Sequence, residues 1–133
     1  ALNYVTSESG RRTNQLHLPV RGCGDGGAYS TLRDITRFWT ALFAGEIVAP
    51  TTVADMVRPR NHAPDLSMRY GLGFWLREER DTVMLEGYDA GVSFRSAHDP
   101  ASGVQYTVIS NTSEGAWPLV RLLDERLPHL ANG

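Results

Sequence analysis

Residues 82–110 read TVMLEGYDAGVSFRSAHDPASGVQYTVIS, and this stretch decides the fold of the chain. Three segments in it are interpreted as strands, 82–87, 92–97 and 104–110, and the last two alternate apolar and polar residues over most of their length. A period of two is typical of β-strands with one buried face. The links between the segments, Asp89-Ala90-Gly91 and 99–103, are rich in residues that favour turns. Strands joined by such short links must be antiparallel, so the sequence predicts a β-meander.

Upstream of the meander the sequence predicts one more strand, over 70–76, and two helices. Ser30-Thr31 followed by Asp34 is a helix-start pattern, and apolar residues at helical spacing then predict an amphipathic helix over 31–44. Pro50-Thr51-Thr52 with Asp55 repeats the start pattern and predicts a short helix that ends before Pro59. Residues 61–67 are expected to form a loop.

The two ends of the chain complete the predicted fold. Residues 1–20 are expected to form a polar hairpin, and Pro118 fits the first turn of a last helix that ends before Pro128. The apolar face expected for that helix is Leu119, Val120, Leu123 and Leu127. The predicted fold class is α+β: an antiparallel β-meander covered by a C-terminal helix, with an N-terminal hairpin and two preceding helices. Residues 1–133 form one domain with no internal boundary.

Composition excludes several classes of function. The net charge of −2, from 15 acidic and 13 basic residues, provides no basic field, so nucleic acid is not an expected partner. No apolar run approaches the roughly 20 residues of a membrane span. The one cysteine, Cys23, cannot form an internal disulfide framework or a cysteine-based zinc site. All 13 basic residues are arginine, which excludes every mechanism that needs a lysine of this chain.

The segment 21–27 holds four glycines in seven residues and is predicted to be a loop. Its Gly22, Gly24 and Gly27 match the letters of the dinucleotide fingerprint, but no helix begins until about Thr31, so no nucleotide cofactor is expected. The loop is instead interpreted as structural or as the lining of a cleft. His17, Cys23 and Asp25 fit no metal-ligand spacing, so no metal is expected. Three other histidines are expected to be solvated: His62, His98 and His129.

Four stretches, in this order and spacing, resemble the C-terminal part of the serine β-lactamase, penicillin-binding protein and esterase superfamily, of the class C type. They are GDGGAYSTLRDITRF at 24–38, YGLGF at 70–74, EGYDAGVSF at 86–94 and VISN at 108–111. The resemblance implies acyl transfer to water on a small-molecule ester, amide or β-lactam, through an acyl-enzyme and without a cofactor.

The resemblance also implies which residues line the cleft. The family's third catalytic motif, Lys-Thr-Gly or His-x-Gly, matches the corner 88–91, and either Tyr88 or Asp89 stands in place of the lysine or histidine. The implied cleft-lining residues are Tyr88, Asp89, Gly91 and Ser93, with Gly24, Asp25, Gly26, Gly27 and Ser30 on the Gly-rich loop. A tyrosine supplies no positive charge at neutral pH, so a neutral ester or amide fits better than a substrate that carries a carboxylate.

The family's Ser-x-x-Lys and Tyr-x-Asn motifs lie upstream of the matching region, and a chain without lysine cannot contain the first. The sequence therefore predicts the C-terminal portion of a serine hydrolase, inactive on its own and with no catalytic residue that can be assigned in this chain. The alternative is a non-catalytic domain that binds a ligand or partner through the Gly-rich loop and Tyr88. The strand 104–110 would lack its N-terminal neighbour, so self-association or pairing with an N-terminal part is expected. The substrate and the cellular compartment stay open.

Overall fold

The computed structural model describes residues 2–17, 19, 21–24, 26–78 and 80–130. Its centre is a six-stranded sheet in which every neighbouring pair is antiparallel and the strands follow their order in the chain. The strands are β3 (Asn61–Ala63), β4 (Met68–Tyr70), β5 (Trp75–Arg77), β6 (Val83–Asp89), β7 (Val92–His98) and β8 (Gln105–Ser110). The predicted meander is therefore confirmed, and it is longer by two strands on the β3 side.

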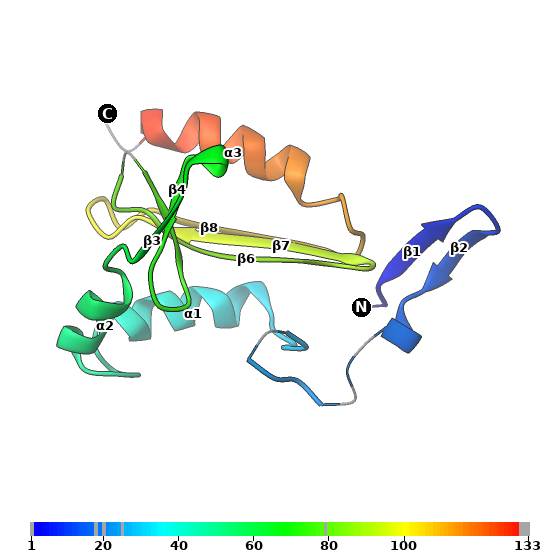
Figure 1. Cartoon of the computed structure of the whole chain (residues 1–133), viewed down its shortest axis with the longest axis horizontal. Coiled ribbons are helices and arrows are strands. Elements are labelled where there is room, and N and C mark those ends of the chain that lie inside the picture. Colours follow the sequence, from blue (N-terminus) through cyan, green and yellow to red (C-terminus); the bar gives the residue numbers. More distant parts are fainter. Residues whose placement is uncertain (1, 18, 20, 25, 79, 131–133) are drawn as a thin grey trace.

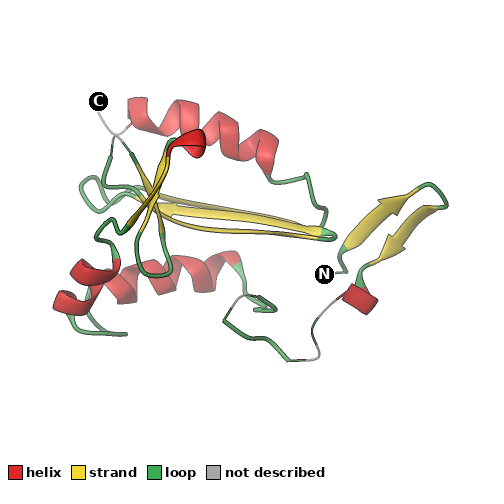
Figure 2. Ribbon diagram, in the orientation of Figure 1, coloured by secondary structure: helices red, strands yellow, loops and turns green. Residues whose placement is uncertain are grey.

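Helices cover both faces of this sheet (Figure 1). On one face lies α3 (Trp117–Leu130), and on the other lie α1 (Leu32–Phe43) and α2 (Pro50–Met56). The result is three layers, helix, sheet and helix, as the colours of Figure 2 show. The α+β class is confirmed, and the C-terminal helix covers only one of the two faces.

The layer of α1 forms because the helix is capped and strongly amphipathic. Thr31 is the N-cap, and its hydroxyl oxygen accepts from the backbone N–H of Asp34 at 3.2 Å. The helix buries Trp39 completely and Leu42 almost completely against Val53 of α2 and Leu76 of β5. The indole Nε1 of Trp39 donates to Ser96 Oγ at 2.7 Å, so its one polar group is satisfied inside the core.

The layer of α3 rests on a smaller apolar cluster. Ala116 and Val120 are buried against Val108 of β8, with Leu123 packed alongside. Leu119, which was expected on this buried face, is 46% exposed instead. The reason is register: the buried Ala116 and Val120 and the partly buried Leu123 define a stripe that leaves 119 on its solvent side.

Three further predictions were wrong in detail. The segment 61–67 is not a loop, because β3 pairs with β4 and a 3-10 turn (Pro64–Leu66) connects them. The predicted strand 70–76 is split into β4 and β5 by a turn in which Gly73 has φ +82°. The last helix continues through Pro128 to Leu130, and nothing in the structure explains why this proline does not end it.

The predicted N-terminal hairpin is confirmed as β1 (Tyr4–Ser7) and β2 (Gly10–Thr13), beyond the ends of β6 and β7 (Figure 1). It is attached at its base. The Tyr4 N–H donates to Asn111 O at 2.9 Å, and the buried Asn14 donates through Nδ2 to Ala90 O at 2.8 Å. The hairpin thus rests on the β6–β7 turn, which is where the sequence places the candidate site.

Candidate functional site

The corner between β6 and β7 is a two-residue turn, Ala90-Gly91, fixed on both sides. Gly91 has φ +80°, and a Cβ there would come within 3.0 Å of the Tyr4 carbonyl oxygen, so glycine is required for the turn and for the close approach of β1. The Ser113 hydroxyl accepts from the Gly91 N–H at 2.8 Å and donates to the Asp89 carbonyl at 3.1 Å. Asp89 Oδ1 accepts from the Ala90 N–H at 2.6 Å.

Tyr88 lies on the α3 side of this corner. Its ring is 62% exposed, its centroid is 6.2 Å from that of Trp117, and its hydroxyl donates to Glu114 Oε1 at 3.1 Å. The hydrogen bond to the Glu114 carboxylate, and the negative charge of that group, raise the pKa of Tyr88 above its usual 10. Tyr88 is therefore a neutral phenol across the physiological range.

Ser93, expected in the cleft lining, is fully buried. Its Oγ donates to Thr112 O at 2.8 Å and accepts from the Ala116 N–H at 3.1 Å. These two bonds attach the start of α3 to β7. In this chain Ser93 therefore has a structural role, and its hydroxyl has no open side for a substrate.

The Gly-rich loop closes on itself between Cys23 and Gly26. The Cys23 N–H donates to Gly26 O at 2.9 Å, and the Gly26 N–H donates back to Cys23 O at 3.3 Å. Gly27 has φ +85°, and a Cβ there would meet Gly22 Cα at 2.9 Å. The predicted Asp25 lies outside the described residues. Gly24 and Ser30 are exposed, so part of the loop faces solvent.

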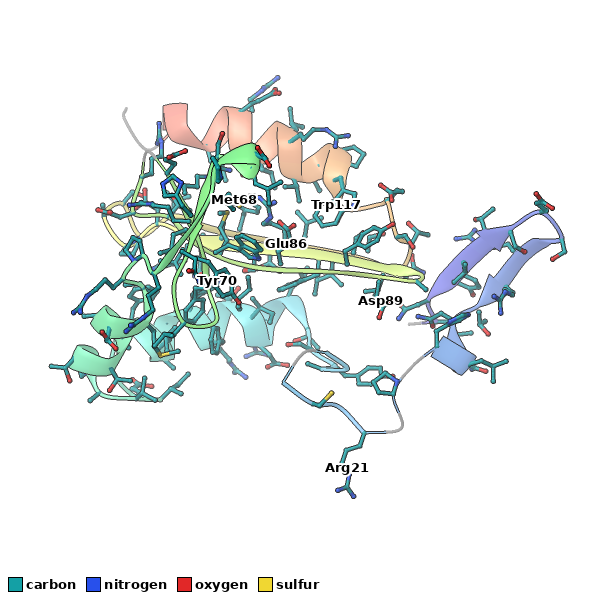
Figure 3. The ribbon with its side chains drawn as sticks, viewed as in Figure 1. Arg21, Met68, Tyr70, Glu86, Asp89 and Trp117 are labelled. Carbon is teal, nitrogen blue, oxygen red and sulfur yellow. The ribbon has the colours of Figure 1, made fainter. Side chains whose placement is uncertain are left out.

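The two groups of predicted site residues lie near the same end of the sheet but on different sides of it. Tyr88 packs with Trp117 of α3, whereas the loop leads into α1 below the other face (Figure 1). Successive strand residues point to opposite faces, so Asp89 follows Tyr88 on the α1 side. Figure 3 shows Asp89 at the tip of the β6–β7 hairpin. A cleft shared by Tyr88, Asp89 and the loop stays a prediction, with Asp89 on the side of the loop.

Two residues at the corner were missed by the sequence reasoning. Glu114 and Trp117 contact Tyr88 across 26 and 29 positions of sequence, and only the return of the chain after β8 brings them there. No local pattern around either residue signals this contact.

Two of the histidines that were expected to be solvated, His62 and His98, lie in different surroundings. His62 is exposed, as expected, and lies 3.1 Å from Glu78 Oε1. His98 was expected to be solvated, but its ring stacks on Trp39 and lies 4.6 Å from Phe43, centroid to centroid. Burial lowers the pKa of His98, so the neutral ring is favoured there. The side chain of His129 lies outside the described residues.

In the described part of the chain, no group of three His, Cys, Asp or Glu side chains could hold a metal ion. None of the helices within the described ranges combines the length and apolarity that a membrane crossing requires.

The fold has a clear counterpart among solved structures. A penicillin binding protein from Bacillus halodurans matches 94% of this chain with a TM-score of 0.86 and 35% sequence identity. The match covers 40% of that protein, so this chain spans less than half of its length. No protein-family model matches the sequence, and neither does any curated protein. The chain therefore has a partial fold of the penicillin-binding protein and β-lactamase type.

Proposed function

We propose that this chain is the C-terminal portion of a β-lactamase-like serine hydrolase that transfers an acyl group to water. The observation that carries the proposal is the structural match over 94% of the chain at 35% identity. In the reaction, a serine hydroxyl oxygen bonds to the acyl carbon and the alcohol or amine leaves with a proton. Water then displaces the serine and releases the acid. The nucleophile and its lysine belong to a preceding segment, because this chain contains no lysine.

The contribution of this chain is one wall of the active site, at the end of β6. On the side of the Gly-rich loop this wall carries the exposed carboxylate of Asp89, and on the α3 side Tyr88 is a neutral phenol bonded to the Glu114 carboxylate. A substrate carboxylate would meet repulsion at this wall. This arrangement supports a neutral ester or amide as substrate, rather than a β-lactam or peptide with a free carboxylate.

The assignment to a serine hydrolase is tested by acylation. A fluorophosphonate probe should label one serine of a longer protein that joins this chain to its upstream coding region, and mass spectrometry should place it in a Ser-x-x-Lys motif. Residues 1–133 alone should show neither labelling nor ester hydrolysis above the buffer rate. Labelling of a serine within 1–133, or the absence of Ser-x-x-Lys upstream, would support the alternative readings and contradict this one.

The substrate preference is tested in the same longer protein by Asp89→Lys. Reversing this charge should raise kcat/KM for an anionic β-lactam relative to a neutral p-nitrophenyl ester by about tenfold, since it exchanges repulsion for attraction at an exposed position. Glu8→Lys makes the same charge change in the exposed β1–β2 turn and should leave the ratio unchanged. Equal ratios in both variants would show that Asp89 does not face the substrate.

A second expectation concerns β8, the last strand in the order of the sheet. Among the described strands only β7 pairs with it, which supports pairing of its other edge with an upstream segment or with a second copy of the chain. Light scattering of residues 1–133 at micromolar concentration should then show association. A monomer whose amides exchange no faster in β8 than in β7 would contradict this.

A further inference from the structure

A cavity of about 390 Å³ lies at the opposite end of β6 from Asp89. It lies among Phe43 at the end of α1, Val53 of α2, Leu76 of β5 and Val83 of β6, and it is open to solvent. Val83 begins β6 and Asp89 ends it, so the cavity is about 20 Å along the strand from the candidate site. It is therefore separate from the wall that the proposed hydrolase would use.

The walls of the cavity are apolar and well ordered by packing. Val53, Leu76 and Val83 are each at most 5% exposed and form a packed floor, and the apolar surface open to the cavity belongs to neighbours such as Phe43, Ala54 and Val57. The volume falls within the range of about 300–1,000 Å³ typical of small-molecule sites. These properties suit the apolar part of a small ligand.

The polar side chains of the cavity are two arginines and one aspartate: Arg69, Arg80 and Asp81. Arg69 is held in place because its Nη2 donates to the Arg77 carbonyl at 2.6 Å. Its Nε is buried and does not open onto the cavity, but the residue as a whole is only half-buried. A guanidinium is the side chain best shaped to bind a carboxylate. The net charge of these three groups is positive, which also favours an anion.

We propose that this cavity binds a small carboxylic acid with an apolar tail. The carboxylate accepts from Arg69 and Arg80, and the tail lies against the partly exposed apolar lining of Phe43, Ala54 and Val57. The proposal is independent of the proposed hydrolase, because it concerns neither the β6–β7 corner nor an upstream segment.

The test compares octanoate with 1-octanol, which share a tail and differ in charge, on 15N-labelled residues 1–133. Octanoate should shift the amide signals of Val53, Leu76 and Val83 in a saturable way and bind at least about tenfold more tightly than 1-octanol. Equal affinities would show that the arginines recognise nothing. The absence of saturable shifts at millimolar octanoate would mean that the cavity holds only water, and either result overturns the proposal.

Variants test separately the arginines and the apolar lining of the cavity. Arg69→Met should weaken octanoate binding about tenfold or more while leaving 1-octanol unchanged. If that variant does not fold, Arg80→Met, at an exposed position of the same cavity, should weaken it in the same direction. Ala54→Trp, exposed on α2 and next to the cavity, should weaken binding of both compounds. Arg33→Met on the exposed side of α1 is the matched control and should alter neither. Unchanged octanoate binding in the folded arginine variants would contradict the proposal.

Discussion

The two faces of the sheet are held by different forces. On the α1 face the contacts are almost all apolar, and Trp39, Leu42 and Val83 are each at most 2% exposed. On the α3 face a charged network connects helix to sheet: Arg95 of β7, with its side chain 9% exposed, pairs with Glu86 of β6 and with Asp124 of α3 at 3.4 Å. Asp124 also pairs with Arg77 and accepts from the Tyr106 hydroxyl.

The difference shows which interactions mainly stabilise the fold and which fix the position of a helix on the sheet. Burial of apolar area is non-directional, so the α1 face should tolerate shifts of a helix that keep its residues buried. A half-buried network of two arginines and two carboxylates holds α3 only in the register that satisfies all of them. Since α3 begins at Trp117, next to Ser93, the network fixes indirectly the side of the corner on which Tyr88 lies.

The largest expected effect is on the apolar face. Trp39→Ala should lower the free energy of unfolding by about 3–5 kcal/mol, because it leaves a large cavity and removes the hydrogen bond to Ser96. Urea denaturation monitored by circular dichroism measures it. Trp117→Ala on the α3 face is the matched control, and its half-buried side chain should cost less than half as much. Equal losses of unfolding free energy in the two variants would show that the two faces do not differ in their contribution to stability.

The second largest loss of stability is expected from the charged network on the α3 face. Asp124→Ala should lower the free energy of unfolding by about 2–4 kcal/mol, since it leaves the buried Arg95 without one of its two carboxylates. The control is Arg37→Ala, which removes an exposed pair with Asp34 at 3.8 Å and should cost no more than about 0.5 kcal/mol. A loss at Asp124 as small as that at Arg37 would mean that the network does not stabilise the docking of α3.

A smaller effect appears in alkaline solution. Burial, together with the Asp124 carboxylate, raises the pKa of Tyr106 to about 12, whereas the unfolded chain has the ordinary value near 10. The folded state therefore binds the proton more tightly, and stability should fall as pH rises from 10 to 12. Urea titrations at pH 9 and pH 11.5 measure the change, and Tyr106→Phe should reduce it more than Tyr88→Phe does. An unchanged pH dependence in Tyr106→Phe would contradict this.

The smallest expected effect is a loss of stability in acid, caused by His98 on the apolar α1 face. Burial lowers the pKa of His98 below its ordinary value near 6.5. The unfolded chain therefore takes up the proton first, and this part of the stability is complete above pH 6.5 and declines as pH falls below it. His98→Phe keeps the ring against Trp39 and should flatten the dependence between pH 7.5 and 5.5. His62→Gln, at an exposed site, is the control and should not flatten it.

Much of the sheet could be predicted because β7 and β8 largely alternate and β6 is an apolar run that ends in a turn. β6, β7 and β8 each have six or seven residues with one face toward a helix, and the turns between them carry glycine or proline. The short strands could not be predicted in this way. The alternation at 70–76 comes from Gly71 and Gly73, and glycine there serves a turn, since a Cβ at Gly71 would lie 2.1 Å from the Met56 carbonyl oxygen.

The candidate site, like the sheet, could be predicted only in part. The turn at Tyr88 and Asp89 could be predicted because glycine follows a strand, but its place in the candidate site was implied only by the resemblance to the family's third catalytic motif. The partners of Tyr88 could not be identified, because Glu114 and Trp117 come from another element. The network around Arg95 was also invisible in the sequence, where an arginine within a strand is typical of a solvent-facing position. Its burial depends on Asp124, which approaches only when α3 packs on the sheet.

The consecutive order of the six strands has a kinetic consequence. Each pairing from β3 to β8 joins neighbours in the chain, so each step closes a short loop and costs little chain entropy. The contact of Trp39 with Ser96 spans 57 positions, and that of Asn14 with Ala90 spans 76. We therefore expect the meander to form early in folding, α1 to dock on it afterwards, and the hairpin to attach last, after the turn that receives it has formed.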